Sequence, residues 1–409
     1  MGFVKKWTGG IEVKRDLHLL LLIGGLYSLS IALSNTFVNV FLWKQSGEFI
    51  DIGLYNLTIV IIQPLTFILA GRLAKKVDRV IVLRLGVIFL ALYYLTVLFV
   101  GENATRFIIL LGALLGIGYG FYWLAFNVLT FEITEPETRD FFNGFLGLLG
   151  SFGGIIGPVT AGYIISKMNA FSGYHVVFGI SLGLFAVAVV LSFFLVRRPA
   201  NGKYLFLRIL SERKNNENWR LITLAHFFQG VREGTFMFVI SIFVFIKTGS
   251  ELALGNFSML NSVIAFIAYF AVSRYIKPHM RKKAILTGGL LLYAGVFLVA
   301  FDVSYTKMLM YAVVIAIAYP ILLVPYTSLT YDIIGTAWNA AEMRIEYIVV
   351  REMYIQMGRV VSLLGFIAVV YFFDPAISLP YFLLIVGAGH TLIYLFVRKI
   401  KPIGHRAEG

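Results

Sequence analysis

Long uninterrupted apolar runs are the feature that most limits how this chain can fold. Twelve stretches of about 20 mostly apolar residues, each long enough to cross a bilayer as a helix, follow one another along the chain. They lie near residues 17–42, 49–71, 81–100, 106–131, 140–166, 173–196, 219–246, 252–273, 284–301, 307–331, 349–373 and 377–397. Only 14% of residues are charged, against about 25% in an ordinary soluble domain. Backbone groups in hydrocarbon must be satisfied within each segment, so the sequence predicts an all-α membrane protein with twelve transmembrane helices.

Basic residues are unevenly divided between the two sides that these spans define. Of the 35 Lys and Arg, 28 fall on one side, mainly in the N-terminus, the loop after the second span, the stretch 197–220, the loop 274–283 and the C-terminus. The other side carries only Lys44, Arg106, Lys167, Lys247 and Lys307. Because cytoplasmic loops carry the excess of Lys and Arg, we expect a multi-pass protein of the cell membrane with both termini cytoplasmic. The first span is too long for a signal peptide, so we expect it to be retained.

A net charge of +14 raises the question of nucleic-acid binding. The basic residues are split among short loops without an aromatic stacking platform, so we expect no nucleic-acid partner. The bilayer, with its anionic lipids, is the expected partner instead. There are no cysteines, which excludes disulfides and thiolate metal sites. We predict no metal site, no cofactor and a monomer.

The second half of the chain resembles the first. IGYGFYWLAFNVLTFEI (117–133) matches IAYPILLVPYTSLTYDI (317–333) at an offset of 200 residues, and GRLAKKVDR (71–79) matches SRYIKPHMR (273–281) at an offset of 202. Parallel repeats of six helices with a binding site at the midplane are a known transporter plan. The sequence therefore predicts two pseudo-symmetric six-helix bundles, with the N-terminal bundle at 1–197, a cytoplasmic linker at 198–218 and the C-terminal bundle at 219–409.

These features together resemble the major facilitator superfamily, and within it the bacterial multidrug or efflux-type members. The family pattern of the loop after the second helix is similar to residues 71–79, where Gly71 and Arg79 are in place, Lys75 replaces the usual Asp, and Asp78 replaces the second Gly. In the family that acidic residue helps to lock the two halves in one state, and Asp78 is the candidate to substitute for it. The family's fourth helix carries an arginine linked to proton coupling, and Gly112 stands at that position here.

The stretch GGIIGPVTAG (153–162) is similar to the family's antiporter motif in the fifth helix, with Gly153, Gly157 and Pro158 in place. Small residues at three- and four-residue steps form a flat helix face against which another helix packs closely. Pro158 is expected to bend the helix. The resemblance implies export.

Three charged residues lie within apolar spans of the second half. They are Arg232 and Glu233 in FFQGVREGTFMFVI (227–240), and Arg359 in QMGRVVSLLG (356–365). Charges at the bilayer centre are costly, and such residues are usually paired, cavity-facing and functional. We expect one of Arg232 and Glu233 to form a buried ion pair with Arg359 and the remaining charge to face the substrate path. A purely architectural cluster is the alternative; otherwise Glu233 is the candidate proton carrier.

The resemblance implies that the first, fourth, seventh and tenth helices line a central path, and an aromatic wall with few polar groups suits an amphiphilic molecule better than a sugar. The candidate substrate and coupling residues, besides the three charges, are Gln229, Tyr27, Asn35, Asn39, Tyr119, Tyr122, Trp123, Asn127, Tyr319 and Tyr326. For any one tyrosine, an interfacial or packing role is the alternative.

Glu132 and Asp332 occupy equivalent points at the cytoplasmic ends of the fourth and tenth helices. With Arg139 near the first and Arg344 and Arg351 near the second, they are candidate gate pairs, although a solvated helix end is an equal alternative. The segment 335–348 is a candidate short amphipathic helix at the inner membrane surface.

The resulting interpretation is a secondary active transporter that works by alternating access and exports an amphiphilic organic or lipid-like compound in exchange for protons. Uptake or facilitated transport of a small anionic solute, held by Arg232 or Arg359, is an alternative. A membrane scaffold or enzyme is a further one. The sequence contains no nucleotide-binding loop, no His or Cys metal spacing and no serine–histidine arrangement, so we expect no enzyme.

Overall fold

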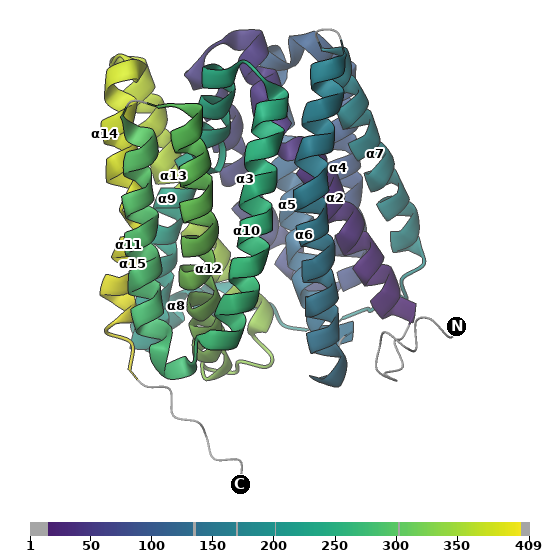
Figure 1. Cartoon of the computed structure of the whole chain (residues 1–409). Coiled ribbons are helices and arrows are strands. Elements are labelled where there is room, and N and C mark those ends of the chain that lie inside the picture. The colour runs from purple at the N-terminus through teal and green to yellow at the C-terminus, as the bar shows by residue number, and fades with distance from the viewer. Residues whose placement is uncertain (1–14, 134–135, 169–170, 201, 302, 402–409) are drawn as a thin grey trace. The chain divides into compact units, whose positions relative to one another are not determined.

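The computed structural model describes residues 15–133, 136–168, 171–200, 202–301 and 303–401 (Figure 1). The long helices are α2 (Arg15–Ser46), α3 (Phe49–Lys76), α4 (Arg79–Val100), α5 (Ile108–Ile133), α6 (Pro136–Lys167), α7 (Ser172–Phe193), α9 (Glu217–Thr248), α10 (Glu251–Tyr275), α11 (Arg281–Ala300), α12 (Tyr305–Gly335), α13 (Arg344–Phe372), α14 (Pro375–Gly387) and α15 (Gly389–Val397). Shorter ones are α8 (Phe206–Ser211) and the 3₁₀ helices η1 (Gly101–Phe107), η2 (Glu212–Lys214) and η3 (Pro278–Met280). The predicted all-α membrane fold is confirmed.

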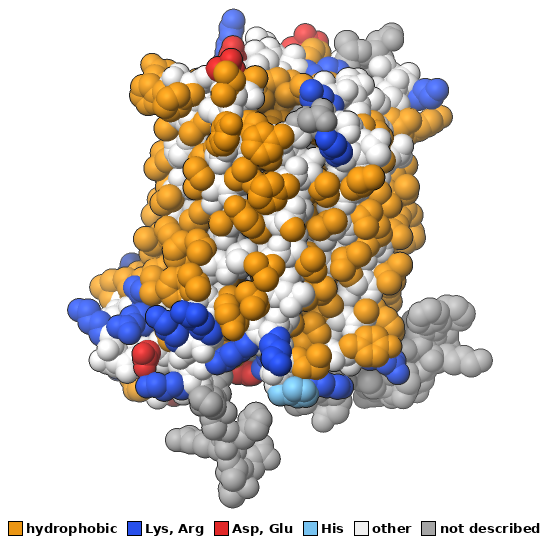
Figure 2. All heavy atoms as spheres, turned by 60° about the vertical axis from the view of Figure 1, so that its left-hand side comes forward, with side chains coloured by type: hydrophobic (Ala, Val, Ile, Leu, Met, Phe, Trp, Pro, Cys, Tyr) orange, Lys and Arg blue, Asp and Glu red, His pale blue; other side chains and the backbone are white. Residues whose placement is uncertain are grey.

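Eleven helical stretches of the described chain are long and apolar enough to cross a membrane. One of them, Arg79–Thr130, has 52 residues and contains α4, η1 and most of α5. The difference from the twelve predicted segments lies in this stretch, because α4 has 22 residues and α5 has 26, each of span length. Large hydrophobic side chains remain exposed on the helices, and Figure 2 shows a face where they cover a broad band with Lys and Arg beyond both of its ends, more of them at the lower end of the view.

The chain divides by its contacts into two compact units. Unit 1 comprises residues 1–47, 65–203 and 250–259, and unit 2 comprises 48–64, 204–249 and 260–409. Two long helices, α3 and α10, therefore contribute residues to both units. The division predicted from the repeat, at 1–197, 198–218 and 219–409, assigns each of these helices whole to one half and stays a prediction.

Close helix packing in unit 1 depends on small residues. On α6, a Cβ placed at Gly157 would lie 2.9 Å from the Cβ of Ala32 on α2, and one at Gly153 would lie 3.4 Å from the Leu29 backbone. A Cβ at Gly86 of α4 would lie 2.5 Å from the Tyr122 backbone nitrogen of α5. The predicted close-packing face of the glycine-rich motif is thus confirmed, and it faces α2.

In unit 2 the corresponding crossing joins α9 and α13, and it is closer still. A Cβ at Gly230 would lie 1.9 Å from the carbonyl oxygen of Ile355, and one at Gly358 would lie 2.0 Å from that of Phe227. Gly234, four residues after Gly230, would place its Cβ 2.7 Å from the Arg359 carbonyl oxygen. Only glycine allows the two backbones to approach this closely. The crossing places residues 232 and 233 beside residue 359.

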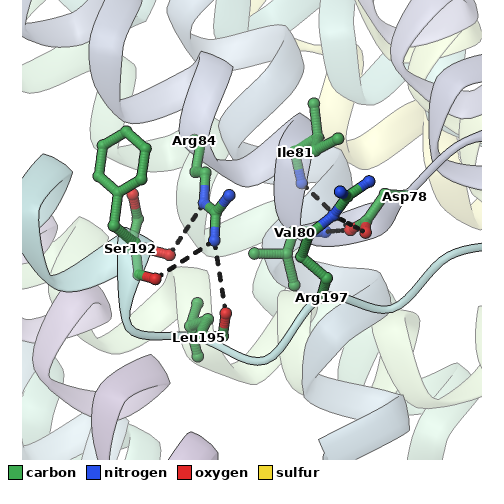
Figure 3. Close-up of polar contacts among 8 residues, drawn as sticks. Asp78, Val80, Ile81, Arg84, Ser192, Leu195 and Arg197 are labelled. Atoms are coloured by element: carbon green, nitrogen blue, oxygen red, sulfur yellow. Dashed lines mark hydrogen bonds and ion pairs between the residues drawn. The ribbon is translucent and has the colours of Figure 1, made fainter.

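The chain between the end of α7 and the predicted linker is held by side chains of α4 and of the loop before it. At the end of α7, the Arg84 guanidinium donates to the carbonyl oxygens of Ser192 (3.1 Å), Phe193 (3.4 Å) and Leu195 (3.4 Å), as Figure 3 shows. Asp78 caps the start of α4 through the Val80 and Ile81 N–H groups and pairs with Arg197 at 3.1 Å (Figure 3). These bonds satisfy helix-end groups that would otherwise lack partners.

The second part of the linker belongs to unit 2 and contains α8 and η2. The Leu205 N–H donates to the buried Glu346 carboxylate at 3.0 Å, and the indole N–H of the fully buried Trp219 donates to the Ile209 carbonyl oxygen at 3.4 Å. The attachment of the linker thus changes from unit 1 to unit 2 between residues 203 and 204.

The expected amphipathic helix at 335–348 is wrong. Residues 336–343 form turns between α12 and α13, and Asn339 has a positive φ of 46°. A non-glycine residue in this left-handed conformation ends regular helix. The Arg208 guanidinium lies over the ring of Trp338 in this turn, 4.7 Å from the centre of that ring.

Candidate functional site

The buried charges of unit 2 lie where α9 and α13 cross. A guanidinium nitrogen of Arg359 donates to Glu233 Oε2 at 2.7 Å, and the side chains are only 21% and 13% exposed. The predicted ion pair between Arg359 and one of the two neighbouring charges is therefore confirmed, with Glu233 as its partner. Arg232 points to a different part of the unit.

A hydrogen-bonded chain runs from Glu233 along α9. Gln229 donates to Glu233 Oε1 at 2.8 Å, and the Tyr319 hydroxyl of α12 donates to the same oxygen at 3.2 Å. The Gln229 amide oxygen lies 2.9 Å from His226 Nδ1, and His226 Nε2 lies 3.2 Å from the Thr330 hydroxyl. Glu233 is thus held by one cation and two neutral donors.

His390 of α15 completes the surroundings of Glu233. Its side chain is fully buried, and Nε2 lies 3.9 Å from Glu233 Oε1. Neither of its ring nitrogens has a hydrogen-bond partner in the described part of the chain. Sequence reasoning missed this residue, although a polar residue inside an apolar span (GAGHTL, 387–392) was a visible signal.

Arg232 lines a cavity of about 200 Å³ within unit 2. Its guanidinium donates to the Tyr311 hydroxyl at 3.4 Å and lies over the Phe236 ring, 4.6 Å from the ring centre. The residue is 6% exposed, and its Nε has no hydrogen-bond partner in the described part of the chain. No described carboxylate pairs with it. Tyr319 and Asn261 provide the other polar groups of the wall.

The predicted aromatic residues of unit 1 form a packed cluster. Tyr27 of α2 stacks on Tyr122 of α5 with ring centres 4.0 Å apart, and both are nearly fully buried. Trp123 meets Tyr27 edge-on at 5.2 Å and is 37% exposed. Of these three residues, Trp123 is the most exposed.

Equivalent tyrosines in the two repeats donate to side chains of α2 and α9, at positions that the repeat does not align. Tyr119 of α5 donates to Asn35 of α2 at 3.2 Å, as Tyr319 of α12 does to Glu233 of α9. The remaining predicted cavity residues are Asn39, which is buried, Asn127, which is half-buried, and Tyr326, which is fully buried beside the His226 ring.

The acidic residues at the ends of α5 and α12 have partners other than those near them in the chain. Arg79 pairs with Glu132 at 2.8 Å, and Arg281 pairs with Asp332 at 2.5 Å. Because residues 79 and 281 are equivalent in the repeat, as are 132 and 332, the two ion pairs are the same contact made twice. The side chain of Arg139 lies outside the described residues, and Arg351 lies over the Tyr331 ring at 6.0 Å.

Other predicted conformational residues lie in unit 1. Gly71 is buried in α3, and Asp78 is bound to Arg197 of the same unit. Pro158 lies inside α6, and its carbonyl oxygen is the group that a Cβ at Gly255 would meet at 2.5 Å.

The comparison with known proteins decides the family. The sequence model of the Major Facilitator Superfamily matches residues 20–343. The chain belongs to this superfamily. It is therefore a multi-pass membrane transporter of the secondary type.

One relative matches nearly the whole chain and another matches less than half of it. "Uncharacterized protein YqgE" of Bacillus subtilis (strain 168) is 59% identical over 401 residues, which is 98% of this chain and 93% of that one. An "Uncharacterized protein in sodM 3'region" of Geobacillus stearothermophilus is 65% identical over 178 residues, 44% of this chain and 83% of that one.

Solved transporters share the fold at low identity. The nucleoside transporter NupG has a TM-score of 0.70 at 15% identity, covering 95% of this chain and all of that one. The E. coli fucose:proton symporter FucP has a TM-score of 0.62 at 18% identity, covering 94% of this chain and 98% of that one. A POT family transporter in complex with 5-aminolevulinic acid has a TM-score of 0.71 at 10% identity, covering 95% of this chain and 97% of that one.

Proposed function

We propose that this transporter exports an amphiphilic organic or lipid-like compound across the cell membrane in exchange for protons. The observation that carries the proton coupling is the Glu233 carboxylate, which is mostly buried and held by Arg359, Gln229 and Tyr319. Protonation would remove its charge and weaken its hold on Arg359. Because Arg359 is on α13 and Glu233 on α9, proton binding would loosen the contact between two helices of unit 2.

The amphiphilic substrate class is supported by the aromatic surface of unit 1. The 37%-exposed Trp123 ring makes a T-shaped contact with Tyr27, whose own ring stacks on the buried Tyr122. Such a wall binds flat or flexible apolar molecules better than sugars, which require many hydrogen-bond partners. We propose that the chain acts as a monomer in the bilayer.

Cytoplasmic termini are supported by the grouping of basic segments within each unit. In unit 1, Arg198 of the linker pairs at 3.3 Å with Asp16 at the start of α2. In unit 2, Lys282 at the start of α11 donates to the Ile400 carbonyl oxygen at 2.8 Å after α15. In unit 1 the linker thus lies at the same end as the start of α2. In unit 2 the start of α11 lies at the same end as the segment after α15. Such a grouping of basic segments is what the positive-inside rule predicts for a cytoplasmic side.

The gate pairs are part of the same proposal. We infer that Arg79–Glu132 and Arg281–Asp332 stabilise one conformation of the alternating-access cycle at the ends of α5 and α12. Glycines 153 and 157 would keep α6 against α2 while this happens.

Uptake of a small anionic solute is the second candidate, and it is favoured by Arg232, which has no described carboxylate partner. The fucose:proton symporter shares only 18% of its residues with this chain, so it shows the fold alone and carries no direction of transport.

The test uses proteoliposomes loaded with a pH-sensitive dye. A panel of amphiphiles is added outside, and the internal pH is recorded. Exchange predicts internal alkalinisation, because substrate entry expels protons, whereas symport predicts acidification. Glu233→Gln is expected to abolish the pH change, and Lys247→Gln, which alters an exposed lysine, to leave it intact. An unchanged response in Glu233→Gln would show that this carboxylate does not carry the proton.

A further inference from the structure

The Arg232 side chain is a buried cation whose charge is not balanced nearby. Glu233, its neighbour in the chain, is engaged by Arg359 at 2.7 Å. The group of Arg232, Glu233 and Arg359 therefore contains two guanidinium groups and one carboxylate. Among the described residues, Arg232 donates to the Tyr311 hydroxyl at 3.4 Å and lies over the Phe236 ring, and no described carboxylate pairs with it. A charge taken out of water without a counterion is unfavourable, so the position is suited to an anion.

Space for such an anion exists beside the guanidinium. The cavity of about 200 Å³ has three polar wall residues, Arg232, Asn261 and Tyr319, and an otherwise apolar wall that includes Ala265 of α10 and Leu292 of α11. Drug-sized ligands occupy pockets of roughly 300–1,000 Å³. This cavity is smaller, so it fits an acidic head with a short apolar stem rather than a whole drug-sized molecule.

The polar groups suit an oxygen anion. A guanidinium presents several N–H donors in a planar fork that matches carboxylate and phosphate oxygens. Its Nε is buried and has no hydrogen-bond partner in the described residues, so the guanidinium has donor capacity that the described chain leaves unused. The apolar side of the cavity would take the methylene groups next to the acidic head.

We propose that the Arg232 cavity binds the carboxylate or phosphate head of the transported amphiphile. That the bound amphiphile is a transported molecule rests on the proposed function. Its binding in the cavity does not require proton coupling. Tyr319 connects the two sites, because its ring lines the cavity while its hydroxyl donates to Glu233 at 3.2 Å. A tyrosine has one hydroxyl proton to donate. An anion that accepts the hydrogen bond of this hydroxyl removes a donor from Glu233. The charged form of that carboxylate is then less stabilised, and its protonation becomes easier.

The experiment measures equilibrium binding of radiolabelled decanoate to the full chain in nanodiscs of neutral lipid, at pH 7 without a gradient. Unlabelled decanoate and decyl phosphate should compete, and decanol should not. Arg232→Gln should weaken decanoate binding at least tenfold. Ala265→Leu, which fills the cavity and keeps the arginine, should weaken it as well. Lys247→Gln should bind like the wild type.

Competition by decanol equal to that by decanoate would overturn the proposal, as would wild-type affinity in both cavity variants. If Arg232→Gln fails to fold, Ala265→Leu still decides. Repeating the measurement with phosphatidylglycerol in the discs separates the sources of the anion. Loss of decanoate binding in the phosphatidylglycerol discs would assign the site to lipid head groups and overturn the proposal that its ligand is the transported molecule. Unchanged decanoate binding would support that proposal. Failure of the proton-exchange assay leaves these results standing, so the two proposals fail separately.

Discussion

Asp78 connects three segments of unit 1 through one carboxylate. It caps α4 by accepting from the Val80 N–H at 2.7 Å, and it pairs with Arg197 at the start of the linker. Burial alone would raise the pKa of Asp78, but the hydrogen bonds from Val80, Arg197 and Ile81 outweigh it and lower the pKa below its usual value. A carboxyl group whose pKa is lowered by folding stabilises the fold above its unfolded pKa, and this stabilisation is lost as the pH falls through the folded value.

We therefore predict that Asp78→Ala lowers the free energy of unfolding by about 1 kcal/mol at pH 7, through loss of the cap. The difference from the wild type should shrink as the pH falls from about 4, the ordinary pKa of an aspartate, through the lower pKa of the folded carboxyl. Melting temperatures in detergent between pH 7 and pH 3 measure this. Asp78→Asn is the control, because asparagine caps helices about as well and does not titrate. A difference that stays constant with pH would contradict the role of the charged carboxylate.

For single residues, the sequence predicted contact partners where the cost of burying a charge leaves few alternatives. Charges in apolar spans are usually paired, which predicted the Glu233–Arg359 contact. It did not predict His390, because its approach to Glu233 depends on how α15 packs against α9. It also placed partners for Asp332 among residues close in the chain, whereas the structure pairs Asp332 with Arg281 across the unit.

The helix pair α9–α13 sets the register of the site. Gly230 and Gly234 flank the two charges at a spacing of four residues, and Gly358 faces them from α13. This spacing is typical of close helix crossings in membranes. The pattern GVREG (230–234) was readable from the sequence, and it explains why the charges and the glycines occur together. For the glycines of α6, the small-residue spacing predicted the close approach to α2, and the export that the motif implies stays a prediction.

We predict that Gly358→Ala abolishes transport and lowers stability by about 2 kcal/mol or more, since its Cβ would lie 2.0 Å from a backbone oxygen and the helices must separate. The matched control is Gly179→Ala in α7, where an added Cβ would meet nothing within 4 Å. Alanine there should be neutral or stabilising by about 0.5–1 kcal/mol, because it favours helix. Melting curves and proteoliposome transport compare the two variants, and equal behaviour of both would refute the close-crossing argument.

The two units of the molecule are connected by more than the linker. Residues 48–64 of α3 belong to unit 2 and residues 65–76 to unit 1, and α10 is divided in the same way after residue 259. Sequence reasoning from the repeat could not show this, because a repeat identifies which segments share an ancestor and not which segments share contacts. The linker, in turn, is attached to unit 1 up to residue 203 and to unit 2 from residue 204.

A cut between Lys203 and Tyr204 therefore tests how the molecule is held together. With a protease site inserted after the exposed Lys203, the cleaved protein should remain one species in gel filtration in mild detergent. The anchors on each side, Asp78–Arg197 and Leu205–Glu346, lie within single units and are not cut. Because α3 and α10 still belong to both units, the fragments must stay interlocked, and the melting temperature should fall by only a few degrees. The uncut protein carrying the same insertion is the control. Separation of the fragments would mean that the linker, rather than the shared helices, holds the units together.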